Sequence, residues 1–473
     1  IHRRNMITID ARRCGAGKTR GENNNSQDDR SINYKINALI EDNEKVLVVL
    51  PGVNLIKDYK KQFPYATVIY SDIATNVSGE LFNSISNGDR LIIITHKAFL
   101  QQQIHINTKQ HYHLIIDEVF DPWKELTIAS QRKDIIFDWN EHTIINDGFI
   151  DYDYFEIEFV DLATNNITCD SNIVRDLTNK NWLNYVKRKQ YDELTRAGKK
   201  RVSVIQELHP YTLTGWKSVH LAAAAFDKTF MSWWMKKHQM AYDTQYPFIP
   251  HLTPILIYCP AFGDGEGFNN SRNKKTTMPW VREQFNEFVA SVSEPVLRLK
   301  NNIDAAGVFS DEYCVKHNVA GINSYSHIEN VSLESSLNPS PEMEAWLNKQ
   351  IDCALLDRKM NHIYSARTGY LYYQVLMRSC LRNEQEASVF TLDNRAMLSI
   401  ADYFDNFIYN EFQIDPPVNF ILNEKQKDKP LTSTERSQIK RYKEKHLRCR
   451  CLSAREVLDK ITKKGNVCPI KTI

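Results

Sequence analysis

The sequence of 473 residues contains no apolar run that approaches the roughly 18–20 residues needed to span a bilayer. We therefore expect no membrane-spanning helix and no membrane partner. A strong charge of one sign is also missing: 60 Lys and Arg against 58 Asp and Glu give a formal charge of +2, which argues neither for nor against a polyanionic partner. No signal-peptide pattern opens the sequence, and the nine cysteines are odd in number and scattered. These features predict reduced thiols and a cytoplasmic location.

The composition is that of a soluble globular protein, with 42% apolar and 25% charged residues. Basic residues dominate after residue 424. We predict a basic C-terminal extension over residues 417–473, which either contacts a polyanion or forms a solvated helix. His446, Cys449, Cys451 and Cys468 gather there, but their spacing matches no closed four-ligand zinc pattern, so no metal site is predicted from them.

The first half of the sequence alternates short apolar runs with amphipathic stretches. Residues 45–50 (KVLVVL) and 90–95 (RLIIIT) are continuous β-branched runs, which is typical of strands buried on both faces of a parallel sheet. Further strands are predicted at 6–9, 66–70 and 113–116, and helices at 54–63 and 97–103. The alternation predicts an α/β fold whose ligands bind at the carboxyl ends of the strands.

This alternation breaks between residues 123 and 209, a polar and aromatic stretch that we interpret as an insertion with a helix over 176–194. A strand is predicted to follow at 218–222. A second α/β unit begins near 254–258, with strands expected at 307–309, 331–333 and 387–392 and a helix over 370–382. The predicted division is a first domain of residues 1–235, a second of 236–416, and the basic extension.

The strongest motif for chemistry is CGAGKT at residues 14–19, directly after the first predicted strand. Gly15, Ala16 and Gly17 let the backbone wrap a polyphosphate so that consecutive N–H groups face its oxygens. Lys18 is expected to reach the β- and γ-phosphates of ATP, and Thr19 to hold Mg²⁺. The positive end of a following helix would add to the attraction. The motif predicts a nucleotide site, with a glycine-rich turn as the alternative interpretation.

Two features depart from the full phosphate-loop pattern. Arg12 stands where that pattern has its first glycine, so the motif matches only the looser GxGKT form. The polar patch at 22–29 (ENNNSQDD) follows at once and weakens the expected helix.

The second motif is LIIDEVF at residues 114–120, a buried-strand run that ends in two adjacent carboxylates. Asp117 is expected to coordinate Mg²⁺, directly or through water. Glu118 is expected to orient and deprotonate the water that attacks the γ-phosphate. Downstream of a phosphate loop, this pattern favours nucleotide hydrolysis over a pair of acids that only cap a strand.

The third motif is QVLMRSCLR at residues 374–382, in a predicted helix. Gln374, Arg378 and Arg382 recur every four residues and would share one helix face. Such a face can enter a cleft between two domains and stabilise charge on the γ-phosphate in the transition state. A solvated basic stripe is the alternative interpretation.

The three motifs, in this order, resemble those of the DNA and RNA helicases of superfamily 2. Their residues look like those of the DEAD/DEAH-type helicases of bacteriophages and plasmids. Pro51 in VVLPGVNL resembles motif Ia of that family, which touches the nucleic-acid backbone. Thr95 and His96 in IIITHKAFL resemble motif Ib, and Asn323 falls in a stretch that resembles motif V. Residues 374–382 resemble motif VI, with Arg382 favoured as the arginine finger.

The sequence departs from the family in three places. Residues 221–225 (LAAAA) stand where the family has its S/T-A-T coupling motif, and the hydroxyls are missing. The spacing of motif VI is QxxxRxxxR instead of QxxGRxxR, and no adenine-reading Q motif is visible in residues 1–11.

The resemblance implies two tandem RecA-like parallel-sheet domains that close on ATP and Mg²⁺ and move along nucleic acid. Single-stranded DNA is the expected track, RNA is left open, and a phage protein acting in DNA replication would work in the host cytoplasm. One alternative is the ATPase of a phage DNA-packaging terminase, whose nuclease carboxylates would have to come from Asp304, Asp311 and Glu312. The other is a degenerate helicase that binds nucleic acid without turnover.

Overall fold

A computed structural model describes residues 6–14, 16, 18, 29–72, 74, 76–129, 135–136, 143–146, 153–159, 168–169, 171–197, 201–262, 266–267, 279–292, 295–299, 313–315, 324–334, 339–353, 362–392 and 399–414. The chain divides into a unit of Ile1–Ile414 and a unit of Asp415–Ile473, and the second unit lies outside the described residues. No helix within the described ranges is long and apolar enough to cross a membrane.

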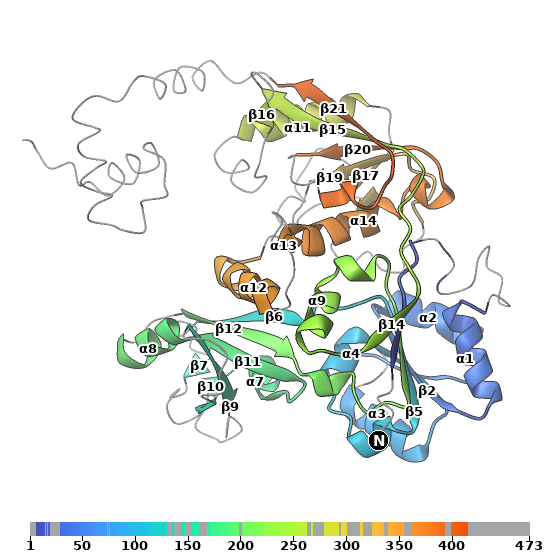
Figure 1. The fold of residues 1–473 in the computed structure, drawn as a ribbon, viewed down its shortest axis with the longest axis vertical. Helices are drawn as coiled ribbons and strands as arrows, with labels where there is room; N and C mark the ends of the chain where they lie inside the picture. Colours follow the sequence, from blue (N-terminus) through green and yellow to red (C-terminus); the bar gives the residue numbers. More distant parts are fainter. Residues whose placement is uncertain are drawn as a thin grey trace, which may run out of the picture. The chain divides into compact units, whose positions relative to one another are not determined.

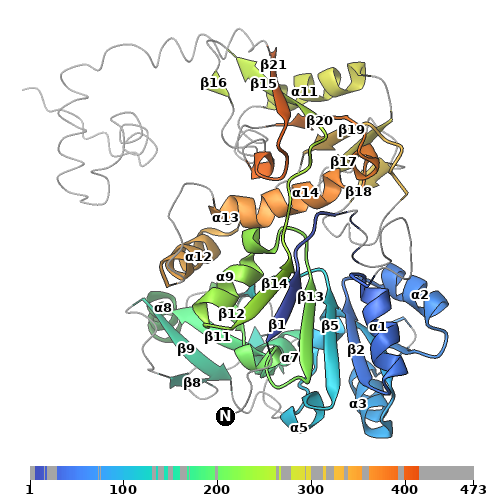
Figure 2. The same cartoon turned by 45° about the vertical axis from the view of Figure 1, so that its right-hand side comes forward.

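The first lobe is built on a seven-stranded sheet in the order β14-β1-β13-β5-β2-β4-β3, in which every pair is parallel. Figure 2 shows β1, β13, β5 and β2 side by side. Its strands are β1 Ile7–Asp10, β2 Lys45–Leu50, β3 Thr67–Ile69, β4 Leu91–Thr95, β5 Tyr112–Asp117, β13 Ser218–Ala222 and β14 Tyr242–Tyr246. The predicted parallel α/β fold is thereby confirmed.

Both faces of this sheet are covered, which explains the continuous apolar runs. On β2, Leu47 and Val49 pack into one core cluster, while Val46, Val48 and Leu50 pack into the other. Helices α1 Ile32–Glu41 and α2 Val53–Gln62 contribute to the second cluster. The first cluster takes residues from α3 Val77–Asn87, α4 His96–Gln101 and α9 Phe230–Lys237. A short helix, α5 Ile106–Lys109, precedes β5.

Between β5 and β13 the chain forms a separate antiparallel sheet, which we call the inserted sheet, in the order β6-β12-β11-β9-β8. Figure 1 shows it beside the first lobe. Its elements are β6 Trp123–Ala129, β8 Thr143–Asn146, β9 Tyr154–Phe159, α7 Ser171–Thr178, β11 Trp182–Lys187, α8 Arg188–Ala197 and β12 Arg201–Leu208. A small pair, β7 Ile135–Ile136 and β10 Thr168–Cys169, accompanies it.

The single helix predicted over 176–194 is wrong, because strand β11 interrupts it. The run WLNYVK pairs with β9 on one side and with β12 on the other. Trp182, Tyr185 and Val186 are buried there, and aromatic and β-branched side chains favour a strand that has two neighbours. Cross-strand pairing therefore overrides the helical pattern, which survives only in α7 and α8.

The second lobe contains another seven-stranded sheet, in the order β16-β15-β20-β19-β17-β18, with β21 paired to β15. All its pairs are parallel except β15 with β16. Its strands are β15 Ile255–Phe262, β16 Glu266–Gly267, β17 Val296–Leu299, β18 Cys314–Val315, β19 Asn330–Leu333, β20 Ala387–Thr391 and β21 Phe407–Gln413, while the predicted strand at 307–309 lies outside the described residues. Its helices are α11 Pro279–Ser291, α12 Pro341–Cys353, α13 His362–Tyr364 and α14 Tyr370–Leu376.

The helix predicted over 370–382 is correct only in its first half. A π-helical turn, Ser365–Gly369, leads into α14, which ends at Leu376. The N–H of Arg378 then bonds the carbonyl of Val375, three residues back, and a 3₁₀ turn Cys380–Asn383 begins after Ser379, whose hydroxyl caps it. This tighter winding breaks the four-residue periodicity, so Gln374, Arg378 and Arg382 do not share one helix face.

Candidate nucleotide and nucleic-acid site

The strand order of the first lobe brings the two predicted nucleotide motifs to one edge. Strand β13 lies between β1, which leads into the phosphate loop, and β5, which ends at the two carboxylates. Because the strands are parallel, their carboxyl ends meet at the same edge of the sheet. The backbone ties these ends together: the Ala223 N–H donates to the Asp10 carbonyl (2.9 Å) and the Glu118 N–H to the Ala222 carbonyl (2.8 Å).

Lys18 is only 8% exposed and points into its own loop. Its Nζ donates to the carbonyls of Arg12 (3.0 Å) and Arg13 (3.1 Å). The N–H of Ile32, the first residue of α1, donates to the Lys18 carbonyl (2.7 Å), so the helix begins directly behind this lysine although it does not follow it in sequence. Gly15, Gly17 and Thr19 lie outside the described residues, and their predicted roles stay predictions.

Arg12, which replaces the first glycine of the full motif, holds the phosphate loop together. Its guanidinium forms a two-point ion pair with the fully buried Asp10, from Nε to Oδ1 (2.9 Å) and from Nη2 to Oδ2 (2.6 Å). The same group donates to the carbonyls of Ala16 (3.3 Å) and Arg30 (2.8 Å) and stacks over the ring of Tyr246, 4.9 Å from its centroid. Arg12 thus joins the two ends of the loop, a role that the motif alone does not indicate.

The two predicted hydrolytic carboxylates stand at the end of β5. Asp117 is buried, and Glu118 follows with a positive φ of 67°, an uncommon conformation for a residue other than glycine. The Nε2 of His96 donates to the Asp117 carbonyl (3.0 Å), and burial lowers the pKa of His96 to about 4, so its ring is neutral. A buried carboxylate beside a phosphate loop would suit Mg²⁺, which prefers oxygen ligands, and Thr19, the other predicted ligand, lies outside the described residues.

Helix α14 of the second lobe contacts both motifs. Gln374 Nε2 donates to Glu118 Oε2 (2.5 Å), and the Tyr370 hydroxyl donates to the same oxygen (3.4 Å). The hydroxyl of Tyr373 accepts the Cys14 N–H of the phosphate loop (2.9 Å). Gln374 was predicted at this cleft, whereas the two tyrosines were not. Their spacing of one and four residues before Gln374 places them on the adjoining surface of the same helix.

The two arginines of the third motif have different surroundings. Arg378 is 7% exposed, and its charge helps to offset the effect of burial, which raises the pKa of the Cys14 thiol. Arg378 is therefore close to the phosphate loop. Arg382 lies in the 3₁₀ turn that follows, beyond the end of α14. Which of the two arginines would reach a bound nucleotide stays a prediction.

A cavity of about 420 Å³ opens beside Glu118. From the first lobe it is lined by Pro51 and His96, two of the residues predicted to touch nucleic acid, and from the second lobe by Arg367 and Gln374. We call it the interlobe cavity. The remaining lining residues are Glu118, Val119, Phe120, Asp121, Thr229, Phe230, Met231, Ala366, Tyr370 and Leu371.

Thr95, which was also predicted to contact nucleic acid, is not among the residues that line this cavity. The hydroxyl of Thr95 caps α4 by accepting the Ala98 N–H (3.1 Å), and Asn323 lies outside the described residues. Where the family has its S/T-A-T motif, Ala225 adopts a φ of 49° and donates its N–H to the Ala11 carbonyl (3.1 Å). Backbone contacts thus connect this segment to β1 without any hydroxyl.

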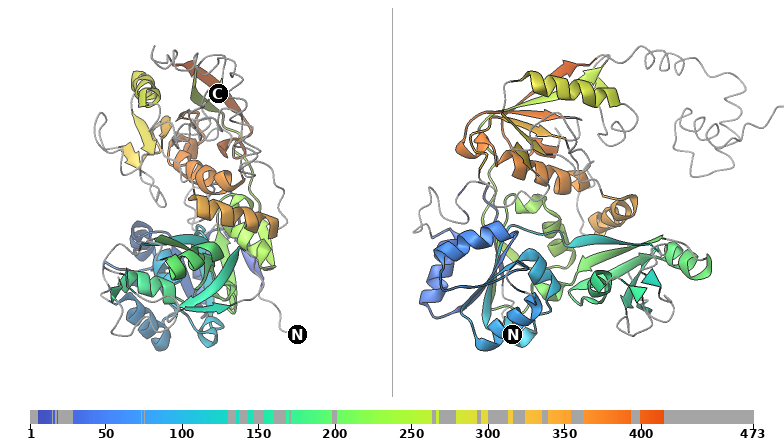
Figure 3. Two further views of the ribbon diagram at one scale, coloured as in Figure 1. Left: turned by 90° about the vertical axis from the view of Figure 1, so that its left-hand side faces the viewer. Right: turned by 180° about the vertical axis from the view of Figure 1, so that it is seen from behind.

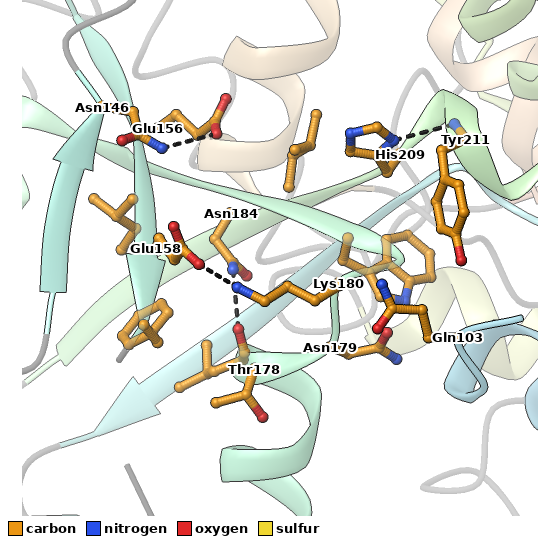
Figure 4. Close-up of a pocket in the computed structure, with 15 residues that line it drawn as sticks. Gln103, Asn146, Glu156, Glu158, Thr178, Asn179, Lys180, Asn184, His209 and Tyr211 are labelled. Carbon is orange, nitrogen blue, oxygen red and sulfur yellow. Dashed lines mark hydrogen bonds and ion pairs between the residues drawn. The ribbon is translucent and has the colours of Figure 1, made fainter. Parts of the chain in front are cut away.

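A second cavity, of about 580 Å³, lies at the inserted sheet and is shown in Figure 4. Its lysine, Lys180, is neutralised by an ion pair with Glu158. His209 accepts the N–H of Tyr211 at Nδ1 (3.1 Å). Because Glu156 also lines it, this cavity has one lysine against two carboxylates.

No family model and no curated protein sequence matches this chain. Among solved structures, S. tokodaii Xpd4 is similar over 85% of this chain and 96% of its own, at 11% identity and a TM-score of 0.44. A form of Mss116p with its NTE and C-tail deleted, solved with ssRNA and AMP-PNP, is similar over 98% of this chain and 87% of its own, at 9% identity and a TM-score of 0.36. Because both TM-scores are low, the fold assignment rests on the strand orders above, and neither likeness assigns an activity to this chain.

Proposed function

We propose that this protein is an ATP-driven nucleic-acid motor, a helicase or translocase in which hydrolysis at the phosphate loop moves one lobe against the other. The observation that carries the proposal is the double contact of α14, which reaches the phosphate loop at Cys14 and the DExx carboxylate at Glu118. A phosphate group bound between these two motifs would compete with those contacts. Nucleotide binding would therefore change how the second lobe sits on the first.

In this proposal the described residues have separate tasks. Lys18 leaves the carbonyls of its own loop to neutralise the β- and γ-phosphates. Asp117 would hold Mg²⁺, which would neutralise charge on the phosphates. Glu118 orients the attacking water and accepts its proton, while Gln374 keeps the Glu118 carboxylate in position. Arg378 supplies a cation from the second lobe.

The nucleic acid is proposed to run past Pro51 and His96, gripped mainly by its phosphates and so without strong sequence preference. His96 lines the interlobe cavity and is hydrogen-bonded to the Asp117 carbonyl, so a single side chain would separate nucleic acid bound there from Asp117, the residue proposed to bind Mg²⁺. Single-stranded DNA is the proposed track, and RNA is an outcome of the test. The terminase alternative relies on Asp304, Asp311 and Glu312, which lie outside the described residues, and no observation favours it.

ATP hydrolysis should be measured without polymer and then with single-stranded DNA, duplex DNA and single-stranded RNA. We expect stimulation by at least one polymer, and loss of turnover in Lys18→Ala and Glu118→Gln. Glu118→Gln keeps the size of the side chain and one oxygen that can accept a hydrogen bond, and it removes the charge and basicity, so this variant should still bind ATP. Strand displacement by the stimulated enzyme then separates helicase from translocase. Polymer binding with no turnover on any polymer would instead support the degenerate module.

A further inference from the structure

Arg367 is a cation of the second lobe that none of the sequence motifs contains. It lies in the π-helical turn Ser365–Gly369, and single π turns often occur at functional sites because they change the direction in which side chains point. Tyr370 and Gln374 follow it three and seven residues later, and all three line the interlobe cavity. The backbone of the turn packs closely against Ser399, because a Cβ added at Gly369 would lie only 2.6 Å from the Ser399 carbonyl oxygen.

The charge of Arg367 is not matched by a close partner. Its Nε is buried without a hydrogen bond, and its side chain makes no ion pair among the residues that the structure describes. Two carboxylates share the cavity. Asp121 interacts with Arg367 only through longer-range charge attraction, and the Oε2 of Glu118 already accepts Gln374 and Tyr370. Because a partly buried guanidinium without an ion pair costs free energy, Arg367 would be stabilised by an anionic ligand.

Resting on the proposed function, we infer that Arg367 binds a phosphate group in the interlobe cavity. A guanidinium suits this ligand because its planar fork donates two parallel hydrogen bonds to a phosphate. The group comes from the backbone of the bound nucleic acid: Pro51 and His96 line the cavity, whereas Lys18 and the other described residues of the phosphate loop do not. Arg367 then couples strand binding to hydrolysis, because its cavity also contains the Glu118 carboxylate.

The test uses the full chain, a fluorescent single-stranded oligonucleotide and a fluorescent ATP analogue. Arg367→Gln removes the positive charge, whereas Arg367→Lys keeps the charge but lacks the planar guanidinium fork. Arg175→Gln, on the exposed surface of α7, is the matched control. Oligonucleotide affinity is measured at several salt concentrations by anisotropy, analogue affinity by titration, and folding by thermal melting.

We expect Arg367→Gln to weaken oligonucleotide binding about tenfold and to reduce the slope of log affinity against log salt by about one phosphate contact. Analogue affinity should be unchanged, and the melting temperature should not fall, because the charge that is removed has no ion-pair partner. Arg367→Lys should recover part of the loss in oligonucleotide affinity, and Arg175→Gln should match the wild type. If analogue affinity falls instead and oligonucleotide affinity does not, the phosphate belongs to the nucleotide.

Two results separate this inference from the motor proposal. Wild-type turnover with unchanged oligonucleotide and analogue affinities in Arg367→Gln would overturn the role of Arg367 and leave the motor intact. A wild type that never hydrolyses ATP, but loses oligonucleotide affinity in Arg367→Gln, would refute the motor and keep the phosphate site.

Discussion

Replacing Trp346 tests how the inserted sheet is held to the second lobe. Trp346 belongs to α12, which lies in sequence between β19 and β20, yet its side chain packs onto the inserted sheet. Its ring centroid is 4.6 Å from that of Tyr185 and 5.2 Å from that of Tyr154, and the ammonium of Lys237 lies 5.4 Å from it. Figure 3 shows α12 next to this sheet in both views. The side chain is 1% exposed.

The expected cost of Trp346→Ala follows from these contacts. Deleting a buried Trp side chain costs about 3–5 kcal/mol, and each aromatic pair adds about 0.5–1.5 kcal/mol to what burial alone provides. We therefore expect the opening free energy of α12 to fall by about 4 kcal/mol. Trp346→Phe should cost clearly less, because it keeps a ring and removes a buried Nε1 that has no hydrogen-bond partner among the described residues.

Native-state hydrogen exchange measures this effect locally, which matters because a chain of several domains need not unfold in one step. In Trp346→Ala, amides of α12, β9 and β11 should lose protection, while those of β2 and β4 in the first lobe should keep it. A loss in α12 below about 1 kcal/mol, or equal losses in both variants, would refute the reasoning, since the aromatic cluster would then not be what holds α12.

Three further perturbations have expected outcomes. Lys109 is 2% exposed, and burial lowers the pKa of its ammonium to about 7. Because the unfolded pKa is about 10.4, the unfolded chain binds more protons between these two values, so the free energy of unfolding should rise from pH 7 to pH 10. Lys109→Met should flatten that rise, as measured by urea titrations at several pH values. Arg12→Ala leaves the buried Asp10 without its ion-pair partner, so the free energy of unfolding, measured by chemical denaturation, should fall by about 3–5 kcal/mol. Arg12→Lys should recover only part of this loss. A loss under about 1 kcal/mol would contradict the role of Arg12 in holding the loop together. Gly369→Ala places a methyl group against the Ser399 carbonyl, so the folded state should lose about 1–3 kcal/mol of stability and the melting temperature should fall. An unchanged melting temperature would show that the turn can shift to make room.

The sequence predicted those parts of the fold that depend on local pattern. Strand β2 was predicted because Val46 to Leu50 are apolar at every position, which a sheet covered on both faces requires. The same pattern placed the phosphate loop and Asp117 at strand ends, and the strand order then brings them to one edge of the sheet.

What the sequence could not provide depends on contacts between distant segments. Strand β11 has helical periodicity, and its pairing partners lie more than twenty residues away on at least one side. Helix α14 ends at Leu376 because the backbone hydrogen bonds change there from the α-helical to the 3₁₀ pattern, and no proline or glycine in the sequence marks this change. Tyr373 contacts the phosphate loop, and Arg367 lines the interlobe cavity, only because the second lobe packs against the first. Neither residue belongs to a motif that the sequence alone reveals.

The central claim is that ATP is hydrolysed between the two lobes and that nucleic acid stimulates this reaction. It is tested most directly by steady-state ATP hydrolysis at saturating single-stranded DNA for the wild type and Glu118→Gln, with ATP-analogue binding measured on the same samples. We predict DNA-stimulated turnover in the wild type, and a fall of about 100-fold or more in Glu118→Gln with unchanged analogue affinity. Equal turnover in both proteins would contradict the role of Glu118, and no wild-type turnover on DNA or RNA would contradict the motor itself.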